Sequence, residues 1–331
     1  MSAEALRVVV RGAGGPEVLH LEPHRLAAPR LGQAQIEVEA CGVAFGDAMR
    51  RRGYLAPPWR FTPGYDLVGV VTAGEQIGRR VGVILGPWVG FGGYTSHLLA
   101  PEHALVPIPV GLDPCVAVAL GLNYVSAHQL IHRTLGLAPG QSLLVHGAAG
   151  GLGSAVLDVA RVAGLRVFGT ASAGKHDRVR ALGGEPIDYR SEDFVRSLRR
   201  RCPDGVDAVL DPIGGSNLLR SHAALAQRGT LVTLGISGAI EQGWSAVIRG
   251  QLLAARLARS RGRRVRPYGF ASTPWSTPAM CRADWATVLQ QHTEGLFTPT
   301  LGAVLPLTEV RRAHRLLDAG AVQGKIVLSC R

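Results

Sequence analysis

Lysine and cysteine are scarce in this 331-residue chain, and both scarcities carry information. Only two lysines occur, Lys175 and Lys325, although Lys+Arg total 36 against 24 Asp+Glu and the formal net charge is +12. The positive charge is therefore almost all arginine. The five cysteines are odd in number and far apart, with no C-x-x-C pair. That spacing argues against a disulfide framework and a thiolate zinc knot, and it suits a reducing cytoplasm.

Long apolar runs and interleaved aromatic residues are also missing. No apolar h-region opens the sequence and no continuous apolar stretch approaches about 18 residues, so we expect no signal peptide and no membrane partner. Aromatic residues are 5% of the chain and do not alternate with the arginine clusters, so we expect no nucleic-acid partner. An anionic small ligand, such as a dinucleotide phosphate, remains as a reason for part of the charge.

What is present is enough apolar sequence for a large core in two domains. Hydrophobic residues make up 47% of the chain and charged residues 18%. The first third has short strand patterns with Gly/Pro turns, at 6–11, 35–40, 68–72 and 81–85. After Asp113 comes a helical pattern over 116–132, and then strands and helices alternate. The predicted strands are 142–146, 166–169, 186–188, 206–210 and 230–234, and the predicted helices between them are 153–163, 175–182, 192–201 and 217–226.

This alternation predicts an α/β protein with a doubly wound parallel sheet. An arginine-rich helix is predicted over 245–265, further helices near 283–294 and 309–319, and a closing strand over 325–329. One glycine-rich turn stands out, because VHGAAGGLG (145–153) follows a strand and opens a helix. Its A-x-G-x-x-G spacing predicts a dinucleotide site in which small residues let the backbone approach a pyrophosphate at a helix N-terminus. The residues concerned are Ala148, Gly150, Gly151, Leu152 and Gly153.

The end of the second strand of the predicted parallel sheet, residues 166–169, discriminates between the two nicotinamide cofactors, NAD and NADP. NAD sites usually place a carboxylate there to bind the ribose 2′-hydroxyl, but no carboxylate occurs before Asp177. Ser172 and Lys175 suit a 2′-phosphate instead, which favours NADPH. Tyr189, after the third strand, could line the adenosine. The plainer alternatives are a solvated helix start and a surface aromatic residue.

Several motifs together resemble the medium-chain dehydrogenase/reductase superfamily, in its zinc-free quinone oxidoreductase and enoyl reductase branch. They are GGPEVL (14–19), FTPGYDLVG (61–69), VHGAAGGLG (145–153) and GKIVL (324–328). The resemblance implies a β-rich GroES-like catalytic domain, residues 1–122 and 265–331, and a Rossmann domain, residues 123–264, with the active cleft at their junction. It also implies NADPH as hydride donor and a homodimer. Zinc-binding members carry metal ligands where this chain has Ala44 and Tyr65, so we expect no metal.

The resemblance also implies further cofactor contacts. Asn123 and Ser126 match the segment that contacts the nicotinamide, and Gly235 and Ile236 match the loop beside it. Phe270 matches the segment that walls the cleft, and Lys325 matches a lysine that can reach the cofactor. For Asn123, Ser126 and Lys325 the alternatives are polar helix positions and a surface lysine.

Without a metal, the most plausible acceptors are quinones and α,β-unsaturated carbonyls, because the charge on their oxygen can be stabilised by hydrogen bonds and then protonated. Many relatives have an Asn and a Tyr where this chain has Ala44 and Met49. The remaining candidate proton donors are Tyr54, Tyr65 and Asp47, although Asp47 could instead cap a helix or pair with an arginine. We therefore expect an NADPH-dependent reductase of a small molecule in a biosynthetic pathway. The alternatives are an NADPH-binding protein without turnover and a tailoring enzyme repurposed for cyclisation or another non-hydride step.

Overall fold

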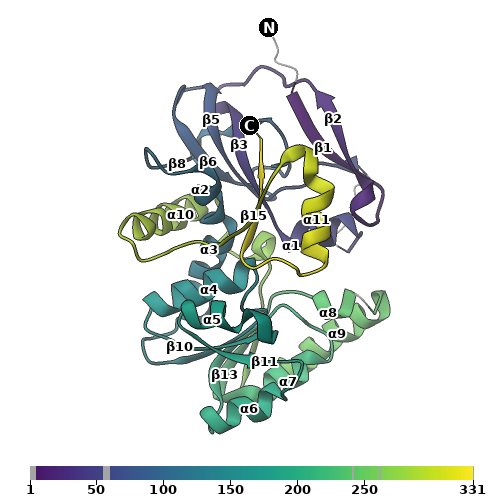
Figure 1. Ribbon diagram of the computed structural model, residues 1–331, viewed down its shortest axis with the longest axis vertical. Coiled ribbons are helices and arrows are strands. Elements are labelled where there is room, and N and C mark those ends of the chain that lie inside the picture. The colour runs from purple at the N-terminus through teal and green to yellow at the C-terminus, as the bar shows by residue number, and fades with distance from the viewer. Residues whose placement is uncertain (1–4, 55–59, 241, 261, 331) are drawn as a thin grey trace. The chain divides into compact units, whose positions relative to one another are not determined.

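Two compact units make up the protein. A computed structural model describes residues 5–54, 60–240, 242–260 and 262–330. The first unit combines Met1–Ser126 with Pro274–Arg331, and the second is Ala127–Thr273 (Figure 1). The boundaries expected from the sequence, after residues 122 and 264, precede the observed boundaries, which follow Ser126 and Thr273. Residues 265–267 were expected in the first unit, but they belong to strand β14 (Arg264–Pro267), which pairs with the sheet of the second.

The first unit is built on two sheets. A seven-stranded sheet has the order β15-β16-β3-β5-β6-β8 with β7 on β3, and a three-stranded sheet has the order β2-β1-β4. The strands are β1 (Ala5–Arg11), β2 (Leu19–His24), β3 (Gln33–Val43), β4 (Arg60–Phe61), β5 (Asp66–Ala73), β6 (Arg80–Ile84), β7 (His97–Pro101), β8 (Val106–Pro107), β15 (Leu301–Pro306) and β16 (Lys325–Ser329). The helices are α1 (Phe45–Arg51), α2 (Pro114–Ala119), α3 (Leu122–His128), α10 (Pro278–Thr293) and α11 (Val310–Asp318), with short 3-10 turns at Pro16–Val18, Glu102–Ala104 and Leu307–Glu309.

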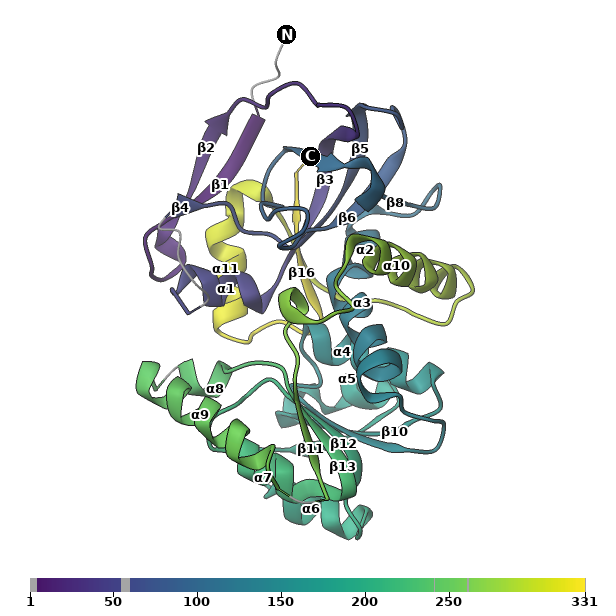
Figure 2. The ribbon, with the colours of Figure 1, turned by 180° about the vertical axis from the view of Figure 1, so that it is seen from behind.

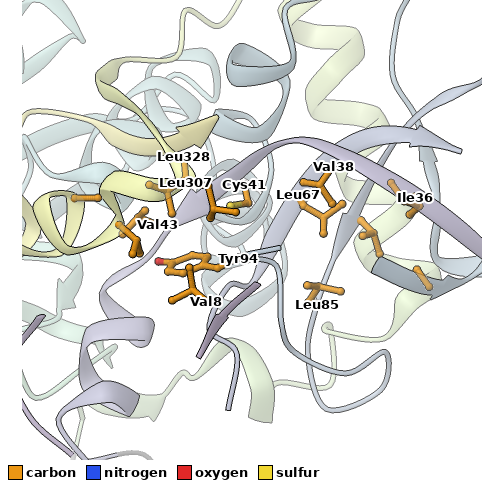
Figure 3. Close-up of a cluster of buried hydrophobic side chains, with 14 of the residues drawn as sticks. Val8, Ile36, Val38, Cys41, Val43, Leu67, Leu85, Tyr94, Leu307 and Leu328 are labelled. Atoms are coloured by element: carbon orange, nitrogen blue, oxygen red, sulfur yellow. The ribbon is translucent and has the colours of Figure 1, made fainter. Parts of the chain in front are cut away.

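The core of this unit joins both ends of the chain. Strand β16 pairs antiparallel with β3, placing Ile326 opposite Val43 and Leu328 opposite Cys41. Figure 3 shows Leu328 and Leu307 packed beside Cys41 and Val43. Burying such side chains stabilises a fold by about 1.5–3 kcal/mol each. The last strand is therefore a central part of the N-terminal sheet.

The second unit has a six-stranded, wholly parallel sheet in the order β11-β10-β9-β12-β13-β14. The strands are β9 (Ser142–His146), β10 (Arg166–Ala171), β11 (Gly184–Asp188), β12 (Val206–Asp211), β13 (Leu225–Thr233) and β14. The helices are α4 (Gly151–Val162), α5 (His176–Ala181), α6 (Phe194–Arg201), α7 (Asn217–Ala224), α8 (Ser237–Ile240) and α9 (Trp244–Leu257), with 3-10 turns at Ala173–Lys175 and Phe270–Ser272. The predicted α/β class and the alternation of strands and helices are confirmed.

Two predicted helices differ from the structure. The helix predicted over 245–265 ends at Leu257, because Gly262 turns the chain at φ +86° and the next residues pair with β13 as strand β14. The helix predicted over 116–132 is divided into α2, α3 and a π-helical segment, Gln129–Leu135. Within the described ranges, Pro114–Leu135 is one run long and apolar enough to cross a membrane, but 72% of its apolar window is buried inside the protein, as in a core helix.

Candidate functional site

The carboxyl ends of the parallel strands form the candidate cofactor site. The strand order reverses between β9 and β12, and open α/β sheets bind ligands at such a switch point. Because all six strands run parallel, the segments that follow them meet at one edge of the sheet (Figure 2). Residues predicted to bind the cofactor follow strands at this edge: Ala148, Gly150, Gly151, Leu152, Gly153, Ser172, Lys175, Tyr189, Gly235, Ile236 and Phe270. Tyr189 and Phe270 follow the two outermost strands, β11 and β14, so they lie at opposite ends of the edge.

The glycine-rich turn connects β9 to α4. Gly147 has φ +67°, a left-handed conformation that favours glycine, and Gly150 is the N-cap of the twelve-residue helix α4. A β-carbon at Gly153 would collide with the carbonyl oxygen of Gly147 and would lie 2.7 Å from Cα of Ala148. The first helical turn is therefore pressed against the loop, and its N–H groups are available to an anion.

The end of β10 carries the residues predicted to discriminate between cofactors. Ser172 and Lys175 are half-buried in the 3-10 turn after Ala171, where the amide of Lys175 donates to the carbonyl of Ser172 at 2.8 Å. The first carboxylate beyond, Asp177, pairs with Arg180 at 2.8 Å. Tyr189 follows β11 with 52% of its surface exposed. The structure thus places a hydroxyl and an ammonium where NAD sites place a carboxylate.

A buried hydrogen-bonded relay lies under this edge, and it was not anticipated from the sequence. The imidazole of His146, at the end of β9, lies 3.0 Å from both Thr170 Oγ1 and Ser221 Oγ. Ser221 Oγ donates to Asp211 Oδ2 at 2.6 Å, so it accepts from His146 Nε2. His146 Nδ1 then accepts from Thr170, and burial lowers the pKa of this histidine. The relay connects the ends of β9, β10 and β12.

Asp211 also fixes the loop after β12. Its Oδ1 accepts from the amides of Ile213 and Gly214 at 2.8 and 2.9 Å. The neighbouring loop after β13 is tightly packed, because a β-carbon at Gly235 would lie 2.9 Å from the carbonyl oxygen of Pro212. Ile236 is half-buried, and its carbonyl accepts from two amides of α8. The only sequence signal for this arrangement was the small residue at 235.

Asn123, Ser126 and Lys325 belong to the first unit. Asn123 is half-buried and Ser126 buried on α3. Lys325 is only 3% exposed, so the alternative of a surface lysine is wrong. Its ammonium donates to both carboxylate oxygens of Asp66, at 3.1 and 3.3 Å, and Asp66 Oδ2 also accepts from the amide of Leu122 at 3.0 Å. This buried ion pair links β16, β5 and the start of α3.

Among the candidate proton donors, Asp47 is engaged in structural contacts. It is fully buried, and its carboxylate accepts from the amide of Ala44 at 3.0 Å and that of Gly64 at 2.8 Å, which caps α1. The hydroxyl of Tyr94 donates to it at 3.1 Å. Burial raises the pKa of Asp47 to about 6. The geometry matches the capping role that the sequence left open.

Tyr65 has a different environment. Its ring meets Phe91 edge-on at 5.3 Å, and the guanidinium of Arg50 is stacked between Phe61, at 4.5 Å, and Phe91, at 4.3 Å. Burial raises the pKa of Tyr65, as does the charge of Asp47, while Arg50 lowers it by charge and hydrogen bonding. The phenol therefore stays protonated at neutral pH and can donate. Tyr54 is half-buried directly before residues 55–59, which lie outside the described ranges.

A second buried relay continues from Asp47. Arg51 is fully buried and donates to His314 Nδ1 at 3.2 Å and to Asp318 Oδ2 at 2.6 Å. His314 Nε2 therefore carries the proton and faces the oxygen of Tyr94 at 3.2 Å. Burial lowers the pKa of His314 to about 3. In the described part of the chain, no three His, Cys, Asp or Glu side chains are grouped so that they could hold a metal ion.

Family profiles and curated proteins match most of this chain. Family profiles described as "Alcohol dehydrogenase GroES-like domain" and "Zinc-binding dehydrogenase" match residues 30–110 and 182–328. The "Synaptic vesicle membrane protein VAT-1 homolog" of Danio rerio is 32% identical over 97% of this chain and 69% of that protein. Its counterpart from Mus musculus is 38% identical over 70% of this chain, and the match spans only 59% of the mouse protein.

A solved structure agrees with these relatives. The quinone oxidoreductase of Escherichia coli, in complex with NADPH, superposes with a TM-score of 0.85 and 25% identity over 98% of this chain and 99% of that one. The chain belongs to the medium-chain dehydrogenase/reductase superfamily, in its quinone oxidoreductase-like branch. The predicted resemblance is thereby confirmed.

Proposed function

We propose that the protein is an NADPH-dependent, zinc-independent reductase of a quinone or an α,β-unsaturated carbonyl compound. The observation that carries this proposal is the sheet edge of the second unit. There a glycine turn opens onto a helix N-terminus, and Ser172 and Lys175 stand in place of a carboxylate. The NADPH complex of the E. coli quinone oxidoreductase, similar over nearly the whole chain, supports the same cofactor.

Different residues would bind the cofactor and transfer the proton. The N–H groups of Gly151, Leu152 and Gly153 would bind the pyrophosphate, and Lys175 the 2′-phosphate. NADPH bound at this edge would supply the hydride, and the substrate oxygen would then carry negative charge. Tyr65 would stabilise that oxygen by a hydrogen bond and then transfer its proton, with Arg50 beside it to offset the phenolate charge. Water restores the tyrosine proton.

The cofactor assignment is tested by Lys175→Ala. Losing a charge-assisted hydrogen bond should weaken NADPH binding about 10- to 100-fold and leave NADH binding unchanged. The matched control is Arg180→Ala, which removes an exposed cation five residues away that already pairs with Asp177. Titration by fluorescence quenching measures both. Equal affinity of the wild type for NADPH and NADH would refute the assignment.

Turnover is tested with a panel of quinones and enones while NADPH absorbance is followed. Tyr65→Phe should lower kcat about 100-fold or more, and Tyr54→Phe should have little effect. The reverse result would move the donor to Tyr54. No NADPH consumption with any acceptor would favour the cofactor-binding protein without turnover, and a product formed without NADPH oxidation would favour the tailoring enzyme.

The setting of the enzyme is part of the proposal. We expect a small-molecule substrate within a biosynthetic pathway and a homodimer. No disulfide joins any of the five cysteines, all of which lie in the described ranges, and this is compatible with a reducing cytoplasm.

A further inference from the structure

A guanidinium packs against two phenyl rings beside the proposed proton donor. Arg50, on α1, lies over the ring of Phe61 on β4, with 4.5 Å to the centroid, and over the ring of Phe91, between β6 and β7, with 4.3 Å to the centroid. Phe91 in turn meets Tyr65 edge-on at 5.3 Å, and Arg50 hydrogen-bonds to the phenol of Tyr65. The rings cover the guanidinium with carbon, so its N–H edge is what remains for a further partner.

The charge of Arg50 is not balanced by a carboxylate of the described residues. The two arginines that follow it, Arg51 and Arg52, both pair with Asp318, at 2.6 and 2.9 Å. Asp47, three residues earlier, accepts from two backbone amides instead. Nη1 of Arg50 is buried and has no hydrogen-bond acceptor in the described ranges. A cation held in an apolar setting is costly unless something brings the opposite charge, so we ask what ligand supplies it.

The position of Arg50 brings that ligand to the proposed reaction site. Arg50, Phe61 and Phe91 are each half-buried, so they lie at the surface of the first unit. Gly46 is one turn before Arg50 on α1, and a β-carbon there would lie only 2.9 Å from the hydroxyl oxygen of Tyr65. The proposed proton donor and the unbalanced cation therefore share one face of α1.

We propose that Arg50 binds a carboxylate of the substrate, so that the compound reduced is an acidic enone or quinone. The inference rests on the proposed reductase function and names the substrate class. A guanidinium edge offers parallel N–H groups that match a carboxylate, and the two rings favour an apolar framework next to it. The simpler alternative is that Arg50 only assists Tyr65. That role would act alike on acidic and neutral substrates, which makes the two separable.

A matched pair of enones tests the proposal. The para-carboxy derivative of benzalacetone and its methyl ester share the reacting group and differ in charge at neutral pH. We expect a KM at least about tenfold lower for the acid, and Arg50→Met should abolish the difference by raising the KM of the acid. The ester reports any effect through Tyr65. The matched control is Arg60→Met, which removes a nearby cation that already pairs with Glu22 and should leave the preference intact.

Calorimetric titration of both compounds, with NADP⁺ present, measures the same preference without turnover. An acid that binds the wild type no more tightly than the ester, or not at all at millimolar concentration, would overturn the proposal. So would a preference that survives in Arg50→Met. Thermal melting checks that this variant is folded, and Arg50→Lys, which keeps the charge but not the paired N–H edge, should show an intermediate preference. Preferential binding of the acid through Arg50 without NADPH oxidation would refute the reductase proposal and leave the carboxylate site standing.

Discussion

In the first unit, burial moves the pKa of individual side chains far from the values they have in free solution. His314 is buried against Tyr94 and Arg51, and the neutral tautomer is the one that satisfies both hydrogen bonds. Its pKa falls from 6.5 to about 3. In the unfolded chain the imidazole takes up a proton below about pH 6.5, which the folded state resists. The stabilising effect of this residue is therefore present above that pH and lost as the pH falls towards 3.

His314→Gln should remove this acid sensitivity. The full difference corresponds to a free energy on the order of 4–5 kcal/mol, and it develops between about pH 6.5 and pH 3. Asp47 acts with the opposite sign, because its raised pKa makes stability fall as the pH rises from about 4 to 6. Urea unfolding of variant and wild type across this range isolates the histidine. His103→Gln, at an exposed position, is the control, and an unchanged pH slope in His314→Gln would contradict the prediction.

The sequence predicts the role of a single residue when that role depends only on its neighbours in the chain. The small residues of the turn and the pair Ser172 and Lys175 are recognisable because their meaning depends on a few neighbours after a strand. Lys325 is different, since its partner Asp66 lies 259 positions away, and neither residue reveals the other. The roles of His146 and His314 were likewise hidden, because burial and three-dimensional partners decide whether a histidine is charged.

Among elements, the turn between β9 and α4 is the most constrained. Gly153→Ala should press a methyl group into the carbonyl of Gly147, displacing the first turn of α4. We expect a loss of about 1–3 kcal/mol in the free energy of unfolding and NADPH binding weakened about tenfold or more. Gly86→Ala is the control, because a β-carbon there meets nothing within 4 Å. Thermal melting and NADPH titration measure the two effects; similar results for both variants would refute the packing argument.

Element prediction succeeded where periodicity and flanking turns agree. Strands 142–146 and 325–329 were predicted to the residue. The helix over 245–265 was extended too far, because arginine is a good helix former and the apolar pattern does not change sharply at Leu257. Only the pairing partner, β13, makes residues 264–267 a strand. The exposed apolar residues of α9, Trp244, Ile248 and Leu252, also mislead the prediction of buried residues, since their spacing resembles that of a core-facing helix side.

The whole first unit depends on a contact between distant segments. Lys325 on β16 and Asp66 on β5 form a buried pair, 3% and 0% exposed. Lys325→Met would leave the carboxylate buried without its cation, at a cost of about 3–5 kcal/mol. The double variant Asp66→Asn/Lys325→Met should be less destabilised than Lys325→Met alone. Urea unfolding measures both, with Lys175→Met as the control lysine; a double variant destabilised as much as Lys325→Met, or more, would count against the pair.

The pairing of β16 with β3 also sets an order of events during synthesis. The second unit is one continuous run, Ala127–Thr273, and can fold as soon as it has left the ribosome. The first 126 residues cannot complete their sheet until the last strand emerges, some 205 residues and roughly 10–40 s later. Throughout that interval the edge of β3 from Ala40 to Val43 lacks its neighbour. The nascent N-terminal segment is thus an open-edged sheet, which can pair with other chains until β16 arrives.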